Sequence, residues 1–398
     1  VIACDKGAPN FSSNRHQATI INGLAMQADI SLEIISGPIT SSYPKYSKLF
    51  VRLGKRSITN KIKINYCSIV NIKLLKFIIF AICMFWKIVK WANSSLDVKE
   101  KVIFIYSPFT HQMLAAVLSK IFFKSSLVLM VPDIPEDVYS NQTLSGWKMS
   151  LIKLSFKLND FLYRKINGFI FLTQAMKDCL PLNNRPYLVI EGAVNASGLQ
   201  TRENRTKYYE RPIMYAGMLM KLYGIEELLR AFERIKNPEA RLWLCGRGDA
   251  EDAIKEAAIR DKRLIYFGAI TPEKVNELER SAWALINPRK PVGEYVKYSF
   301  PSKTMEYLLS GRPVLMYRLP GVPEEYYEYL TEISASSSDG LEEALKNILD
   351  LTESEAECIG NKGREFVLIN KNEIVQAKKM IDFMHRLTVD RLNLTVHC

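Results

Sequence analysis

The segment 299–314 combines residue types that suggest a binding site for an anion. Pro301 is tolerated in the first turn of a helix, and Gly311 is the residue type that commonly ends one. The first amides of such a helix lack intrahelical acceptors and, with the helix dipole, attract a group such as a diphosphate. The residues expected to bind there are Ser302, Lys303, Thr304 and Glu306.

Glu306 has a different role from its neighbours, because a carboxylate is a poor ligand for phosphate but a good acceptor for hydroxyl groups. It lies one turn inside the predicted helix. A site that joins phosphate donors to a carboxylate acceptor suggests a nucleotide sugar as the ligand.

Three more loops in this half of the chain follow predicted strands and carry glycine. Gly217 is followed by Lys221 and Gly224, while Gly246-Arg247-Gly248 and Gly268 follow the next two strands. Glycine lets backbone approach a ligand, although it also punctuates strand ends without any ligand. Each loop alone is weak evidence for a ligand site, but the three loops followed in order by the segment 299–314 are stronger evidence.

Alternating apolar runs and helical segments indicate an α/β protein with parallel sheets. The 398 residues are too many for one ordinary core. We expect two doubly wound, Rossmann-like domains facing a cleft, over residues 1–194 and 212–379, with a polar linker at 195–211. The predicted strands are 1–4, 31–36, 102–106, 126–131, 168–173, 187–192, 213–216, 241–245, 264–267, 284–287 and 314–317.

The composition bears on compartment and partners. Seven scattered cysteines, without a CxxC, favour a reducing compartment and argue against a zinc site. No signal peptide is evident, so we expect a cytoplasmic protein. Residues 1–200 hold 24 Lys and Arg against 11 Asp and Glu, whereas residues 201–398 hold 30 against 31. The N-terminal half is thus expected to meet an acidic surface, either nucleic acid or anionic lipid.

Residues 72–91 favour the lipid. Ten uninterrupted apolar residues, 77–86, are too few to span a bilayer. Lys73, Lys76, Lys87 and Lys90 fall in one sector of a helical wheel, and the rest of the circumference carries Leu74, Leu75, Phe77, Ile78, Ile79, Phe85 and Ile88. This is the pattern of a helix lying in an anionic membrane interface. A core helix with its lysines in water is the alternative.

The C-terminal half resembles glycosyltransferase family 4. The resemblance rests on Gly217, Tyr223-Gly224-Ile225, Leu228-Leu229, Ala231-Phe232, Leu244-Cys245-Gly246, Gly248, Tyr266-Phe267-Gly268, Asn287-Pro288-Arg289, Phe300-Pro301-Ser302-Lys303, Glu306-Tyr307, Gly311 and Pro313-Val314. It is specific over residues 205–320 and fainter over 1–200. It implies the GT-B fold, a retaining and sugar-nucleotide-dependent enzyme of the bacterial polysaccharide type, and a last helix, 380–398, that returns to the N-terminal domain.

The resemblance also implies roles for residues. Glu306 would hold the ribose hydroxyls, and the backbone of 301–304 would meet the diphosphate and the sugar. Gly7 and Arg15 would contact the acceptor, with Arg15 binding an acceptor phosphate or forming only a surface pair. Asp133 would be a catalytic residue that contacts a sugar from the opposite wall of the expected cleft. Alternatively, Asp133 belongs only to a turn and caps a helix.

Four positions depart from the family pattern. The first glutamate of the family falls on Tyr298, the arginine after the first glycine on Met218, the following lysine on Tyr223, and the histidine of the His-Asp turn on Pro132. Lys221, Arg289 or Lys303 would then supply the cationic charge. The chain has no Asp-x-Asp, which agrees with chemistry that needs no metal or other cofactor.

The sequence predicts transfer of a sugar from a nucleoside diphosphate sugar to a lipid-linked glycan, peripherally on the inner face of the plasma membrane. Binding of nucleic acid is disfavoured because no recognised motif accompanies the charge. A nucleotide-sugar epimerase of the same fold and a non-catalytic partner subunit of a glycosyltransferase remain as alternatives.

Overall fold

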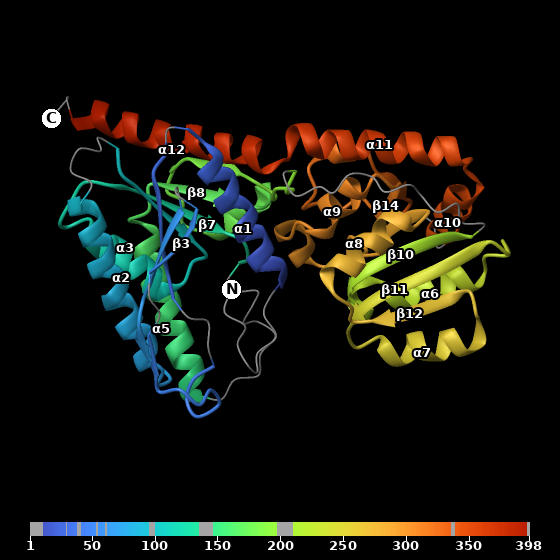
Figure 1. The fold of residues 1–398 in the computed structure, drawn as a ribbon, viewed down its shortest axis with the longest axis horizontal. Helices are drawn as coiled ribbons and strands as arrows, with labels where there is room; N and C mark the ends of the chain where they lie inside the picture. The colour runs from blue at the N-terminus through green and yellow to red at the C-terminus, as the bar shows by residue number, and fades with distance from the viewer. Residues whose placement is uncertain are drawn as a thin grey trace. The chain divides into compact units, whose positions relative to one another are not determined.

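The computed structural model describes residues 11–28, 30–37, 41–52, 55–59, 62–94, 100–134, 146–196, 210–335 and 339–395. The chain divides into two compact units (Figure 1). Unit 1 comprises Val1–Glu191 and Glu373–Cys398, and unit 2 comprises Gly192–Asn372. The expected first strand at 1–4 and positions 197–209 of the expected linker lie outside the described residues.

Unit 2 is built on one six-stranded parallel sheet. Its strands are β10 (Arg211–Met218), β11 (Ala240–Arg247), β12 (Leu264–Gly268), β13 (Ala284–Asn287), β14 (Val314–Tyr317) and β15 (Thr331–Ile333). They lie in the order β12-β11-β10-β13-β14-β15, which is 3-2-1-4-5-6 along the chain. This is the doubly wound order, and the direction of winding reverses between β10 and β13.

Helices connect these strands. They are α6 (Ile225–Glu233), α7 (Glu251–Arg260), α8 (Pro272–Ser281), α9 (Lys303–Ser310), α10 (Gly340–Asp350) and α11 (Glu353–Asn370), with 3-10 turns η2 (Lys221–Tyr223), η3 (Glu294–Tyr298) and η4 (Glu324–Tyr326). β13 and β14 are buried along their whole length, as their uninterrupted apolar sequences predict.

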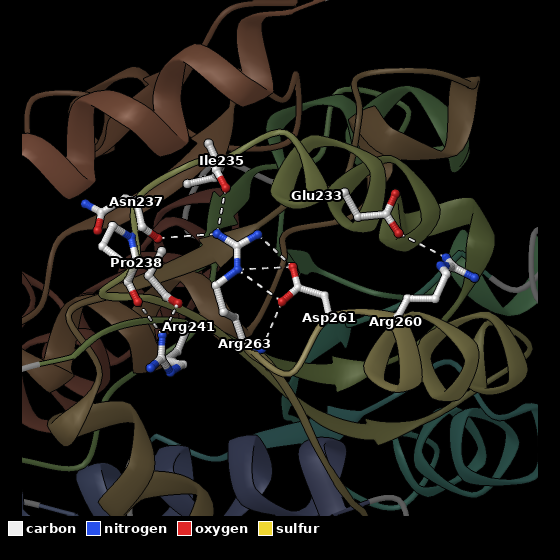
Figure 2. Close-up of polar contacts among 9 residues, drawn as sticks. Glu233, Ile235, Asn237, Pro238, Arg241, Arg260, Asp261 and Arg263 are labelled. Atoms are coloured by element: carbon white, nitrogen blue, oxygen red, sulfur yellow. Dashed lines mark hydrogen bonds and ion pairs between the residues drawn. The ribbon is translucent and has the colours of Figure 1, made fainter.

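Arg263 stabilises the loops at the end of this sheet where the parallel strands begin. Arg263, just before β12, donates hydrogen bonds to the Asp261 carboxylate at 2.7 Å and to the Ile235 carbonyl at 2.6 Å (Figure 2). Its guanidinium also lies 5.0 Å over the ring of Phe232. Ile235 and Asp261 lie in the loops that lead into β11 and β12, and Phe232 lies in α6, so this arginine has a structural role.

Unit 1 contains a second parallel sheet, β6-β7-β8-β9, and smaller pieces. The strands are β6 (Val102–Tyr106), β7 (Ser126–Val131), β8 (Gly168–Phe171) and β9 (Tyr187–Val189), then β1 (Leu32–Ser36), β4 (Ile62–Tyr66) and β3 (Lys55–Thr59) in a three-stranded sheet, and the antiparallel pair β2 (Phe50–Val51) and β5 (Ile69–Val70). β1 pairs parallel with β4, whereas β3 pairs antiparallel with it. The sequence analysis predicted none of the four strands β2, β3, β4 and β5.

The helices of unit 1 are α1 (Phe11–Met26), α2 (Leu75–Ser94), α3 (Thr110–Ser119), α5 (Gly146–Tyr163) and α12 (Glu373–Thr395), with the 3-10 turn η1 (Gln174–Cys179). One apolar cluster joins α1, the four-stranded sheet and α12: Ile20, Leu24, Val128, Met130, Ile170, Ile190, Ala377, Met380, Phe383 and Leu387. The last helix therefore packs in the core of the N-terminal unit, and it begins at Glu373 rather than at the expected residue 380.

Candidate functional site

The reversal point of the sheet in unit 2 is the natural place for a ligand, because the loops after β10 and β13 diverge there. Gly217 lies at the carboxyl end of β10, and Asn287 ends β13. Arg289 follows two residues later, with its backbone N–H donating to the Asn287 Oδ1 at 3.3 Å. The sequence of unit 2 thus places an arginine, a glycine and the start of α9 on neighbouring connections.

Tyr307 ties α9 to β10. Its hydroxyl donates to the Ala216 carbonyl at 3.1 Å and accepts from the Ala216 N–H at 2.8 Å. The side chain is fully buried, and burial raises the pKa of Tyr307 well above its ordinary value. The phenol is therefore neutral, and its two hydrogen bonds hold α9 beside β10 at Gly217.

The start of α9 differs in detail from the prediction. The helix begins at Lys303 with Ser302 at the N-cap, so Pro301 precedes the first turn instead of lying in it. The Thr304 N–H is not without a partner, since it donates to the Pro301 carbonyl at 2.9 Å. The Thr304 side chain is fully buried, and its hydroxyl donates to the Met316 sulfur at 3.8 Å.

Lys303 is held by two carboxylates. Its Nζ lies 3.0 Å from Glu279 Oε1 and 2.7 Å from Glu306 Oε2. Burial acts to lower the pKa of Lys303, but the charges of Glu306 and Glu279 outweigh it and raise the pKa overall. Glu279 is 2% exposed and is the residue that the sequence analysis missed; a glutamate among the polar residues of α8 gave no signal of burial.

Arg289 has quite different surroundings. It is 7% exposed, and its guanidinium lies 5.3 Å over Tyr223 and 4.8 Å over Tyr295. One hydrogen bond, at 3.3 Å, runs from its Nη1 to the Ser299 hydroxyl. Its buried Nε has no hydrogen-bond partner, and among the described residues no carboxylate pairs with it.

Two glycines of the loop that follows β11 are explained by packing. A Cβ at Gly246 would lie 1.8 Å from the Gly217 carbonyl oxygen, and one at Gly248 would lie 2.1 Å from the Leu219 carbonyl oxygen. Since no side chain fits at such distances, these glycines are required for β10 and β11 to end side by side. Gly217 itself would place a Cβ 3.0 Å from the Tyr215 hydroxyl.

Lys221 lies in η2 and has its own partner. Its Nζ is 3.0 Å from Glu226, and its side chain is 57% exposed. The hydrogen bond to Glu226 raises the pKa of Lys221. Of the three cations expected to meet a diphosphate, two are therefore engaged by carboxylates.

The expected residues of unit 1 are only partly described. Gly7 lies outside the described residues, and Arg15 lies in α1 with its side chain outside them. Asp133 follows β7 and is exposed. Partial desolvation raises the pKa of the Asp133 carboxyl group above its ordinary value.

Comparison with known proteins adds to this geometry. Residues 210–352 match the family model described as glycosyl transferases group 1. The structure is similar to sucrose-phosphate synthase from Thermosynechococcus elongatus, with a TM-score of 0.63, 15% identity, and coverage of 95% of this chain and 94% of that one. No curated protein sequence matches the chain.

Two other similar structures hold nucleotides. HepE of Anabaena, in complex with UDP, has a TM-score of 0.54 and 12% identity, covering 82% of this chain and 86% of that one. A trehalose-6-phosphate protein from E. coli, bound with UDP-2-fluoro glucose, has a TM-score of 0.60 and 11% identity, covering 93% and 95%.

The chain has the GT-B fold and carries a glycosyltransferase group 1 domain. It is a glycosyltransferase. The fold class and the enzyme class predicted from the sequence are thereby confirmed, and the reversal point of unit 2 lies inside the matched domain.

Proposed function

We propose that this glycosyltransferase belongs to family 4, retains the anomeric configuration, and moves a sugar from a nucleoside diphosphate sugar to a lipid-linked glycan during polysaccharide synthesis. The observation that carries the donor half is the reversal point within the group 1 domain, where Gly217 lies at the end of β10 and Arg289 follows the adjacent strand β13. UDP-sugars are the first donors to test, because two proteins of similar structure were solved with uridine nucleotides.

The chemistry proposed is stabilisation of a departing diphosphate. The C1–O bond of the donor breaks, and its electron pair goes to the phosphate oxygen, where a cation and the amides at the start of α9 disperse the charge. The acceptor hydroxyl attacks C1 from the same face and gives its proton to the leaving phosphate. No metal enters this proposal. Glu306 would hold the ribose hydroxyls, and Asp133 would contact a sugar.

The acceptor half rests on the surface of α2. Its exposed apolar residues recur at a helical spacing of four, at Ile78, Ile82 and Trp86, which are 58%, 53% and 61% exposed. Ile88, which the sequence analysis placed with them, is buried at 4%. The apolar circumference therefore divides into a flank that packs in unit 1 and a flank that faces solvent, and the solvent-facing flank is the one proposed to contact lipid.

The apolar surface continues onto neighbouring elements. α3 packs against both α2 and α5, and the ring of Phe85 meets Phe122 at 5.5 Å. Exposed apolar side chains at the end of α3 and on α5 extend the surface: Leu118, Ile121, Phe122, Leu154, Leu158 and Phe161. Lysines accompany them: Lys90, Lys124, Lys157 and Lys165 are exposed. Apolar and basic groups together suit an anionic lipid surface.

Two further findings bear on this contact. No helix among the described residues is both long and apolar enough to cross a bilayer. A hollow of about 240 Å³ beside α2 is lined mainly by Phe50, Val51, Ile69, Val70 and Ile79. We infer that the protein lies on the inner face of the plasma membrane rather than in it.

The test is a panel of radiolabelled UDP-, GDP- and ADP-sugars, incubated with the protein and a bacterial lipid extract. We expect label from one donor in the organic phase, in the presence of EDTA as in its absence. Loss of transfer in EDTA, restored by magnesium or manganese, would contradict the metal-free mechanism. Conversion of the donor into its epimer without transfer would contradict the proposed reaction itself.

A further inference from the structure

The three cations that could meet a diphosphate are not equivalent. Lys303 sits between Glu279 and Glu306, and that group of three carries a net negative charge. Lys221 pairs with Glu226 at the surface. An anion arriving at either lysine would compete with a carboxylate already in contact.

Arg289 faces no such competition among the described residues. A buried charge without a counter-charge is costly, and a buried N–H without an acceptor adds to that cost. Here the guanidinium lies near two tyrosine rings, Tyr223 and Tyr295, and its Nε has no partner. Aromatic faces attract a cation but leave its edge, where the donors are, for another ligand.

Its position adds a second argument. Arg289 follows β13 at the reversal point, and its guanidinium lies 5.3 Å over the ring of Tyr223 in η2, the turn that follows β10. The guanidinium thus lies near the end of β10, the place where the sheet opens for a ligand.

We propose that Arg289, supported by Tyr223 and Tyr295, is the residue of this chain that binds the donor diphosphate. The proposal rests on the proposed function. Met218 and Tyr223 occupy positions where glycosyltransferase family 4 commonly has an arginine and a lysine. Tyr223 then has a different role from that lysine, because its ring packs against Arg289, and Arg289 supplies the positive charge that Met218 and Tyr223 lack.

The planar fork of this arginine suits two phosphate oxygens at once. When the C1–O bond breaks, its electron pair remains on the diphosphate, and the guanidinium lies beside that developing charge without proton transfer to it.

Arg263 offers a matched control in the same unit. It too lies over an aromatic ring, but its guanidinium is satisfied by Asp261 and by backbone carbonyls. Arg289→Met and Arg263→Met remove the same group from opposite edges of one sheet. The measurements are thermal melting and calorimetric affinity for UDP and for uridine, with ADP and GDP also tried on the parent protein.

For Arg289→Met we expect a tenfold to hundredfold loss of UDP affinity, unchanged uridine affinity, and a melting temperature equal to or above that of the parent. For Arg263→Met we expect a lower melting temperature and a UDP affinity within about threefold of the parent. Arg289→Lys should recover part of the loss, because the charge is kept without the fork.

The outcomes separate the two claims. If the parent binds none of the nucleoside diphosphates, the proposed function fails, and this inference fails with it. If the parent binds UDP but Arg289→Met binds it equally well, the proposed function stands and the role of Arg289 is wrong. A lower melting temperature of Arg289→Met with UDP affinity intact would make it a structural arginine like Arg263.

Discussion

The two units both contain parallel α/β structure, yet they differ in how many ion pairs their described residues form. In unit 2 most surface lysines and arginines pair with carboxylates, as Arg318 does with Glu332 and Lys346 with Glu342. Between described residues of unit 1 the structure records one ion pair, His385 with Glu100. Exposed lysines and exposed apolar side chains occur together in the segments that contain α2, α3 and α5.

From this difference we infer which kind of anionic ligand each unit binds. Unit 2 pairs most of its surface cations with carboxylates, whereas among the described residues no carboxylate pairs with the buried Arg289, which suits a small anion. Unit 1 exposes apolar and basic side chains on α2 and α5 and at the end of α3, which is the combination that the proposed contact with anionic lipid requires. The net charge of the sequence alone could not separate these two uses.

The largest effect is expected on the surface of unit 1. Replacing Ile78, Ile82 and Trp86 by serine should abolish sedimentation with anionic vesicles, since each side chain contributes about 1.5–3 kcal/mol when buried. The folded state should survive, because all three are exposed. Vesicle sedimentation and thermal melting measure the two properties.

Two controls sharpen this test. Ile88→Ser should unfold unit 1, since Ile88 is buried on the other flank of α2. Changing Lys73, Lys76, Lys87 and Lys90 to glutamine should remove only the preference for anionic over neutral lipid. Sedimentation of the triple serine variant at the level of the parent would show that α2 does not contact the membrane.

In unit 2, Glu306→Ala should weaken donor binding by about tenfold to hundredfold, as expected for loss of a charge-assisted hydrogen bond of about 1.5–3 kcal/mol. Glu279→Gln is the control, because Glu279 also holds Lys303. If both variants bind the donor equally weakly, Glu306 acts through Lys303 and not on ribose. Calorimetry with the donor identified by the panel decides this.

Tyr307→Phe should lower the free energy of unfolding of unit 2 by about 1–3 kcal/mol, because it leaves the buried N–H and carbonyl of Ala216 without their partner. Urea denaturation followed by tryptophan fluorescence would measure it. An unchanged midpoint would mean that the two hydrogen bonds between α9 and β10 contribute nothing to stability.

The last prediction concerns acid. Burial lowers the pKa of His16 and of His111 in unit 1 to about 4. Because the unfolded chain takes up these protons near pH 6.5, stability is full above that pH and is lost as the pH falls toward 4. The expected slope is up to about 1.4 kcal/mol per pH unit for each histidine.

His111 can be tested separately, since its ring contacts Phe77 and Phe80. His111→Phe should flatten the dependence of the denaturation midpoint on pH between 7 and 5. The same slope in the variant and the parent would assign the acid sensitivity to other groups.

The fold of unit 2 could be predicted well, since strands that are buried on both faces read as continuous apolar runs, as at 284–287 and 314–317. The short strands at 50–51 and 69–70 could not, because two residues leave no period to detect. The flank of α2 that packs inward was likewise hidden, since the exposed Ile82 and the buried Ile88 are the same residue type on one apolar helix.

For the site, the sequence supplied the candidate residues but not their partners. It named Lys221, Arg289 and Lys303 as possible cations and could not choose between them. The choice depends on Glu226 and Glu279, which lie within ion-pair distance only in the folded chain. The buried Arg289 also carried no signal of burial, because arginine is usually exposed.

The most direct test of the whole account is the initial rate of label transfer from the identified nucleotide sugar to lipid extract, on anionic vesicles and on neutral ones. We predict transfer that is faster on anionic vesicles, and loss of most of that transfer in Arg289→Met on both. Equal transfer to a water-soluble sugar without any vesicle, with Arg289→Met as active as the parent, would contradict the account.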